Sequence, residues 1–118
     1  MRLLVCGGRD LGNLHAVWAA LDLLHAVRPV THLIHGAARG ADTLAARWAA
    51  ARHIPATPFP ADWSKGLGAG HARNAQMLTE GRPDLVVAFP GGRGTADMVR
   101  RARAAGVETV ALGELGYQ

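Results

Sequence analysis

Residues 85–95 of the chain read LVVAFPGGRGT, and this stretch indicates the type of fold. Its first four residues form an apolar run that suits a strand buried on both faces, and a helix-like pattern begins near Ala96. Three glycines connect the two, and a backbone without side chains can approach a ligand closely. The start of the helix offers unpaired N–H groups and the positive end of its dipole, which favour an anion such as phosphate. Because Arg93 adds a permanently charged, forked donor, the stretch predicts a phosphate-binding turn between a strand and a helix.

Strand-like and helix-like runs alternate on both sides of this stretch. Strands are predicted over residues 2–6, 31–35, 56–59, 84–89 and 108–112. Helices are predicted over residues 13–27, 41–52, 71–80 and 96–105, and the tail 113–118 is expected to fray. The alternation predicts an α/β fold: a single Rossmann-like three-layer domain over residues 1–118, with a five-stranded parallel sheet in the order 3-2-1-4-5 and helices on both faces. In that order the chain reverses direction between the first and fourth strands, and ligands bind there, at the carboxyl ends of the strands.

The composition favours a cytoplasmic protein with one hydrophobic core. Of the 118 residues, 49% are hydrophobic, and no run approaches the roughly 20 apolar residues that a membrane helix needs. Cys6 is the only cysteine, so neither a disulfide framework nor a zinc site is predicted, and no cofactor is expected. The formal net charge of +4 raises the question of nucleic acid, but twelve of the thirteen basic residues are arginine and none forms the long basic run of a nucleic-acid-binding tail.

Glycines gather where the ligand is expected. Eleven of the fifteen glycines lie in loops that follow the first four predicted strands: Gly7, Gly8, Gly12, Gly36, Gly40, Gly66, Gly68, Gly70, Gly91, Gly92 and Gly94. Basic residues occur near the same loops: Arg9, Arg39, Lys65, Arg73 and Arg93. One edge of the sheet is therefore predicted to be glycine-rich and cationic, and to bind a ligand that carries phosphate.

The segment HGAARGAD, residues 35–42, is a second glycine loop that leads into a helix. Gly36 and Gly40 would allow a ligand to approach, and Arg39 would be its charge partner. Asp42 has two interpretations. Its carboxylate either accepts hydrogen bonds from a ribose or water, or favours the helix dipole without any ligand.

The segment GGRD, residues 7–10, ends the first strand beside the predicted reversal point. Gly7 and Gly8 would let the backbone approach a base or a phosphate. Arg9 either joins this contact or pairs with Asp10.

Further positions are candidates for ligand contact. Arg73 and Asn74 lie in the first turn of a predicted helix, where a cation opposes the dipole, and a bound anion would relieve that conflict. Trp63 lies in the long loop 60–70 and either stacks on a nucleobase or pins the loop to the domain. Thr95 either caps the following helix or contacts a phosphate, since both roles use the same hydroxyl.

Several other activities are not implied. The stretch 85–95 lacks the lysine of the P-loop motif and follows a late strand, unlike the dinucleotide fingerprint. Neither an ATPase nor an ordinary dehydrogenase is therefore indicated. His32 and His35 would point to opposite faces of a strand and form a poor metal pair. No nucleophilic triad can be argued, and Cys6 is expected in the core.

Together these motifs resemble the SLOG superfamily, and specifically its YspA/cpYpsA-related branch. The resemblance is carried by GGRD (7–10), HGAARGAD (35–42), FPADW (59–63), AGHARN (69–74) and FPGGRGTADM (89–98). It implies a Rossmann-like fold that binds nucleotides or nucleotide-derived ligands. The superfamily includes the LOG phosphoribohydrolases, which release the base from cytokinin nucleotides, and the DNA-processing protein DprA.

The resemblance to the phosphoribohydrolases breaks at one position. Those enzymes carry a PGGxGTxxE motif and an arginine in the helix before it, which Arg73 resembles. The motif glutamate falls on Met98 here, and Asp97 lies one place earlier, about 100° away on a helix. N-glycosidic cleavage needs a carboxylate, so binding is the leading hypothesis. A phosphoribohydrolase-like N-glycosidase, with Arg73, Asp97 or Asp42 as catalytic candidates, is the enzyme alternative, and DNA binding in the manner of DprA is a third.

The sequence thus predicts a ligand-sensing or signalling module that binds a nucleotide or nucleotide-derived phosphate. The phosphate is expected between residues 36–40 and 91–95, with Arg73 and Arg93 as charge partners. The predicted ligand-binding residues are Gly7, Gly8, Arg9, Gly36, Arg39, Gly40, Asp42, Trp63, Arg73, Asn74, Gly91, Gly92, Arg93, Gly94 and Thr95. The resemblance also allows a homo-oligomer paired through helices beside the sheet.

Overall fold

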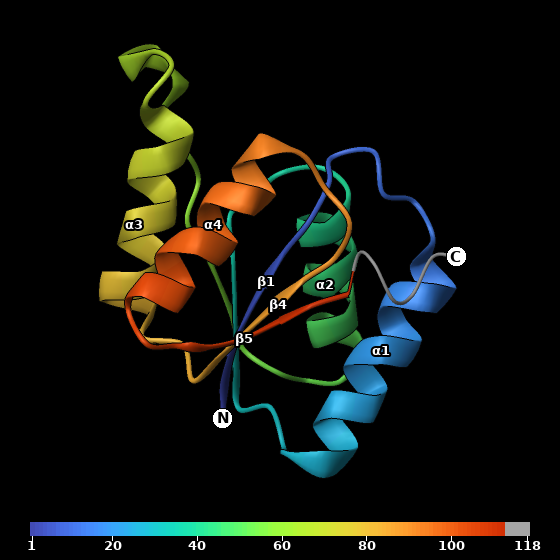
Figure 1. Cartoon of the computed structure of the whole chain (residues 1–118). Coiled ribbons are helices and arrows are strands. Elements are labelled where there is room, and N and C mark those ends of the chain that lie inside the picture. Colours follow the sequence, from blue (N-terminus) through green and yellow to red (C-terminus); the bar gives the residue numbers. More distant parts are fainter. Residues whose placement is uncertain (113–118) are drawn as a thin grey trace.

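The computed structural model describes residues 1–112, and the prediction about the tail 113–118 lies outside the described residues. Five parallel strands form one sheet (Figure 1): β1 (Arg2–Cys6), β2 (His32–His35), β3 (Ala56–Pro58), β4 (Leu85–Ala88) and β5 (Glu108–Ala111). The helices between them are α1 (Leu14–Val27), α2 (Ala41–Ala51), α3 (Ala69–Gly81) and α4 (Arg93–Ala104), with a short 3-10 helix, η1 (Trp63–Lys65). The strand order is β3-β2-β1-β4-β5. The predicted fold class and strand order are therefore confirmed.

Helices cover both faces of the sheet, with α1 and α2 on one side and α3 and α4 on the other (Figure 1). Alternate residues of the central strands face these two layers. Leu3 and Val5 of β1 pack in a cluster with Val17 of α1, whereas Leu4 of β1 packs with Met77 of α3. Because both faces are buried, the central strands read as unbroken apolar runs rather than as alternating patterns.

The loops after β1, β2 and β4 meet at the carboxyl edge of the sheet. The N–H of Gly8 donates to the carbonyl of Pro90 (2.7 Å), and the N–H of Ala41 donates to the carbonyl of Gly8 (3.1 Å). Gly40 has a φ of +74°, and a Cβ at this position would collide with the carbonyl of Gly8. The chain therefore needs a glycine at position 40 to bring the loop after β2 against the loop after β1.

Two helices begin earlier than predicted. The first residue of α4 is Arg93 rather than one near Ala96, because the carbonyl of Gly92 already accepts from the N–H of Ala96 (3.0 Å). Helix α3 begins at Ala69 rather than at His71. Part of each predicted glycine loop is thus the first turn of a helix, which moves the helix starts closer to the predicted site.

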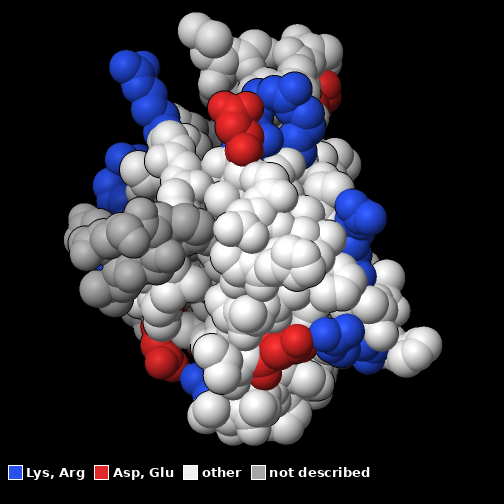
Figure 2. All heavy atoms as spheres, turned by 90° about the vertical axis from the view of Figure 1, so that its right-hand side faces the viewer, with Lys and Arg blue, Asp and Glu red and all other residues white. Residues whose placement is uncertain are grey.

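The side of the molecule that carries α1 is poor in charge (Figure 2). Uncharged residues fill the middle of this face, and the charged side chains lie toward its edges. Leu23 and Val27 of α1 are both exposed. Pairing of two copies through a helix beside the sheet stays a prediction.

None of the helices described within residues 1–112 is long and apolar enough to cross a membrane.

Candidate nucleotide-binding cleft

A cleft of about 710 Å³ opens at the carboxyl edge of the sheet, which is a volume typical of small-molecule sites. Its walls come from the loop after β1, the turn before α4, the region of η1 and the first turn of α3. The predicted ligand-binding residues that line it are Gly7, Gly8, Arg9, Asp42, Trp63, Arg73, Asn74, Gly91, Gly92, Arg93, Gly94 and Thr95. Gly36 and Arg39 instead line a neighbouring cavity of about 350 Å³, and Gly40 lines neither.

The glycines beside the cleft fall into two groups. At Gly7 and Gly8 a Cβ would collide with other parts of the chain, for example with the carbonyl oxygen of Pro90 at 2.8 Å from the Cβ of residue 8. These glycines let the loops pack against one another. At Gly92 and Gly94 a Cβ would meet nothing within 4 Å. The backbone is thus open toward the cleft at the start of α4.

The start of α4 forms one wall of the cleft. Its N-cap residue is Gly92, which has no side chain to accept hydrogen bonds from the first N–H groups of the helix. Thr95 lies within the first turn, so it is not the cap residue, and its Oγ1 lies beside Gly91. Arg93 is exposed and lines the cleft. The positive end of a helix and a guanidinium therefore share this wall, an arrangement that suits an anion.

Asp42, in the first turn of α2, lies buried at the inner end of the cleft. Its Oδ2 accepts hydrogen bonds from the N–H groups of Gly36 (3.1 Å) and Ala38 (3.2 Å). Burial raises the pKa of Asp42 to about 6, against the opposing effect of these N–H groups and of the nearby Arg73. The carboxyl can therefore change its protonation state near neutral pH.

Arg73 lies in α3 and points toward the loop after β2. Its Nη1 donates to the carbonyl of Gly36 (2.6 Å), and its Nε donates to Oδ1 of Asn74 (3.0 Å). Partial burial lowers the pKa of Arg73 from its ordinary value, and the nearby Asp42 counters that effect. A Cβ at position 36 would lie 2.5 Å from Nη1 of Arg73, so the guanidinium can lie there only because residue 36 is a glycine.

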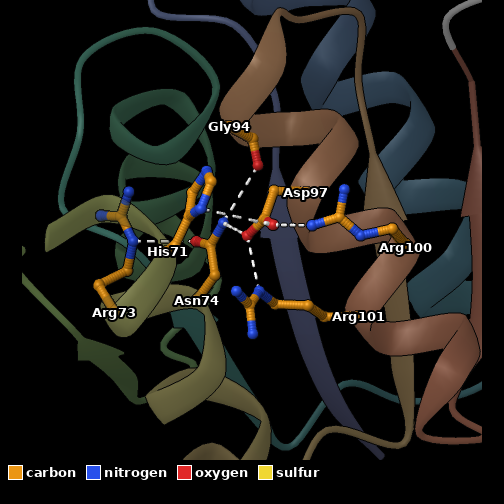
Figure 3. Close-up of polar contacts among 7 residues, drawn as sticks. All are labelled: His71, Arg73, Asn74, Gly94, Asp97, Arg100 and Arg101. Carbon is orange, nitrogen blue, oxygen red and sulfur yellow. Dashed lines mark hydrogen bonds and ion pairs between the residues drawn. The ribbon is translucent and has the colours of Figure 1, made fainter. Parts of the chain in front are cut away.

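A polar network centred on Asp97 joins α3 to α4 (Figure 3). Asn74 donates through Nδ2 to Oδ2 of Asp97 (3.1 Å) and to the carbonyl of Gly94 (3.1 Å). Oδ2 of Asp97 also accepts from Nε of Arg101 (2.8 Å), and its Oδ1 accepts from Arg100. Burial acts to raise the pKa of Asp97, but the hydrogen bonds from Asn74 and Arg101 outweigh it and hold that pKa below its usual value.

The catalytic candidates lie in different environments. Asp97 is 2% exposed, is paired with two arginines and does not line the cleft. Met98, at the position of the phosphoribohydrolase glutamate, is fully buried in the apolar cluster with Leu4. Arg73 and Asp42 do line the cleft. Of the three candidates, those two are placed to reach a ligand.

Trp63 and Arg9 stand together at the mouth of the cleft. The guanidinium of Arg9 lies over the indole ring, 5.1 Å from its centroid, which is a favourable cation–π arrangement. Trp63 is 56% exposed. The indole therefore has surface available for a ligand. The contact with Arg9 favours its present orientation.

Some of the cleft wall was not predicted from the sequence: Cys6, Asp10, Leu11, Ala38, Leu67, Gly70, His71, Met77 and Pro90. Asp10 adjoins the predicted Arg9 and Pro90 adjoins the predicted Gly91, so their place in the motifs is a usable signal. Cys6 lies in the core, as predicted, in the cluster with Leu4 and Met77, and it also lines the cleft. Leu67 is fully exposed, and a single apolar residue in a loop gives no pattern that could assign it.

The fold and the cleft together define a class: a Rossmann-like α/β protein with a glycine-lined cleft between the first and fourth strands. Residues 1–66 match the sequence profile of the YspA, cpYpsA-related SLOG family, and the chain belongs to that family. This confirms the predicted resemblance. The matched residues include the loops after β1 and β2 and the helix η1 but not the turn before α4.

Two individual proteins are similar to this chain, one in sequence and one in fold. The chain is 38% identical over 122 residues to the Gene 61 protein of Mycobacterium phage D29, covering 96% of this chain and 97% of the phage protein. The crystal structure of Acinetobacter baumannii MurG matches with a TM-score of 0.57 and 15% identity, over 93% of this chain and 34% of MurG. The chain thus spans about a third of MurG, and this likeness concerns the fold alone.

Proposed function

We propose that the cleft binds a nucleotide or nucleotide-derived ligand through its phosphate, as a ligand-sensing module. The observation that carries the proposal is the start of α4 in the cleft wall. The N-cap residue Gly92 has no side chain that could accept hydrogen bonds from the first N–H groups of α4. Arg93 of α4 and Arg73 of α3 line the same cleft. A phosphate there would gain main-chain N–H donors and charge-assisted hydrogen bonds together.

The remainder of the cleft offers contacts suited to a nucleoside. Trp63 is more than half exposed, and an aromatic side chain can stack on any of the bases. Asp42 lines the inner end, where its carboxyl can accept hydrogen bonds from ribose hydroxyls. Membership of the SLOG family supports the same ligand class.

Binding is favoured over hydrolysis because neither position 97 nor position 98 offers a carboxylate to the cleft. Asp97 is held by arginines outside the cleft, and position 98 carries a methionine within the core. One observation supports an enzyme: Asp42 lines the cleft, and its pKa of about 6 suits proton transfer near neutral pH. An N-glycosidase that uses Asp42 is therefore the second candidate. Chromatography for free base after incubation with ribonucleoside 5′-monophosphates distinguishes it from binding alone.

Calorimetric titration with the four ribonucleoside 5′-monophosphates tests the proposal. We expect at least one to bind, and Arg93→Ala to weaken that binding by about tenfold or more, because one charged donor to the phosphate is lost. Arg103→Ala is the matched control, since Arg103 is an exposed arginine in the last turn of the same helix and lies outside the cleft. Equal affinities for the two variants would contradict the proposed phosphate position.

A further inference from the structure

A second cavity of about 350 Å³ adjoins the cleft on the side of the loop after β2. Arg9, Ala38, Trp63 and Arg73 line both spaces. The two cavities are therefore neighbours with a common wall, which contains two guanidinium groups and one indole. The same three side chains would contact a ligand in either space.

Among residues 1–112, the charged side chains that line the second cavity are all cationic. Its three charged lining residues are Arg9, Arg39 and Arg73. Asp42 lies behind the loop, buried, with its Oδ2 accepting from two main-chain N–H groups, and it lines the cleft instead. Asp62 neighbours the cavity in sequence, but its Oδ1 accepts hydrogen bonds from the N–H and hydroxyl of Ser64.

Two of the three arginines that line this cavity, Arg73 and Arg39, differ in how they are held. Arg73 is anchored, with Nη1 donating to the carbonyl of Gly36 (2.6 Å), so its charge is fixed at the boundary between the two spaces. Arg39 is exposed, and within residues 1–112 it forms no ion pair. One fixed and one unpaired guanidinium around a hollow form a receptive site for a second anionic group.

We infer that the ligand is a nucleotide with two separate anionic groups, of which the second binds between Arg39, Arg73 and Arg9. This inference rests on the proposed function, since the first phosphate is the one placed at the start of α4. The two anionic groups are expected to lie apart on the ligand, because their binding sites lie in different cavities. The start of α4 lines the cleft but not the second cavity, and Arg39 lines the second cavity but not the cleft. A nucleoside 3′,5′-bisphosphate has the required chemistry, whereas a 5′-monophosphate lacks the second group.

The test compares three probes on the same base by calorimetry: the 5′-monophosphate, the 5′-diphosphate and the 3′,5′-bisphosphate. We expect the bisphosphate to bind about tenfold more tightly than the monophosphate, because a second charge-assisted contact forms. The 5′-diphosphate carries its extra phosphate next to the first and is expected to gain less. Arg39→Ala is expected to remove the advantage of the bisphosphate and to leave the affinity for the monophosphate within about twofold.

Arg47→Ala provides the control, because Arg47 is an exposed arginine of α2 that lines neither cavity. Monophosphate binding without any gain for the bisphosphate, or a gain that survives Arg39→Ala, would overturn this inference and leave the proposed function standing. If none of the probes binds on any of the four bases, the proposed function itself fails, and this inference fails with it.

Discussion

Two buried carboxylates near the same edge of the sheet, Asp42 and Asp97, have opposite surroundings. Asp97 accepts from an amide and two arginines and joins α3 to α4 outside the cleft. Asp42 accepts from main-chain N–H groups and lines the cleft. The pKa of Asp97 is lowered, whereas burial raises that of Asp42 to about 6. A carboxylate that is paired with arginines therefore supports the structure, whereas one that is held mainly by main-chain donors stays available to a ligand.

Asp97→Ala is expected to give the largest effect on this comparison. The substitution leaves the amide of Asn74 and the guanidinium of Arg101 without their shared acceptor. We expect the free energy of unfolding at pH 7 to fall by about 3 kcal/mol. Urea denaturation followed by circular dichroism measures it. An unchanged midpoint would show that the network between α3 and α4 is dispensable.

Asp42→Asn is expected to change how stability depends on pH. The folded pKa of Asp42 lies above its unfolded value of 3.8, so its contribution to stability is fully present below that value and is lost as pH rises through about 6. Between pH 4 and pH 8 the free energy of unfolding of the parent should therefore fall by roughly 2 kcal/mol relative to that of the asparagine variant. Urea denaturation at both pH values provides the comparison. Parallel curves for the two proteins would mean that Asp42 is not protonated near pH 6.

Arg100→Ala is expected to have the smallest effect on the free energy of unfolding. It compares the two arginines that pair with Asp97. The side chain of Arg100 is 70% exposed, whereas that of Arg101 is 34% exposed. Exposed ion pairs contribute little, so we expect a loss of about 0.5 kcal/mol or less for Arg100→Ala and a larger one for Arg101→Ala. The same urea assay ranks the two variants. A larger loss for Arg100 would reverse the order that exposure predicts.

The sheet could be predicted because its determinants are local. The apolar runs that became β1 and β4, and the glycines that follow them, are visible as consecutive residues, and the strand order follows from general rules of parallel α/β folds. The helix starts were less accessible. Whether α4 begins at Arg93 or near Ala96 depends on the backbone conformation of Gly92, which no side chain pattern determines.

The roles of individual residues depended on contacts between distant segments. Gly40 looks like a ligand-facing glycine in its own loop, but a side chain there is excluded by the carbonyl of Gly8 in another loop. Asp97 looks like a displaced catalytic carboxylate until Asn74, from a different helix, is seen to donate to it. The division into two cavities is likewise a property of the packed loops, because Arg9 and Trp63 meet only in three dimensions.

An NMR titration of the isotope-labelled chain with the ribonucleoside 5′-monophosphate that binds most tightly would locate the phosphate directly. The proposed phosphate position predicts the largest amide shifts at Gly92, Arg93 and Gly8, around the start of α4, and none above background at the end of that helix, around Arg103. Shifts confined to α1 or to the last turn of α4, or no shifts at saturating nucleotide, would contradict it.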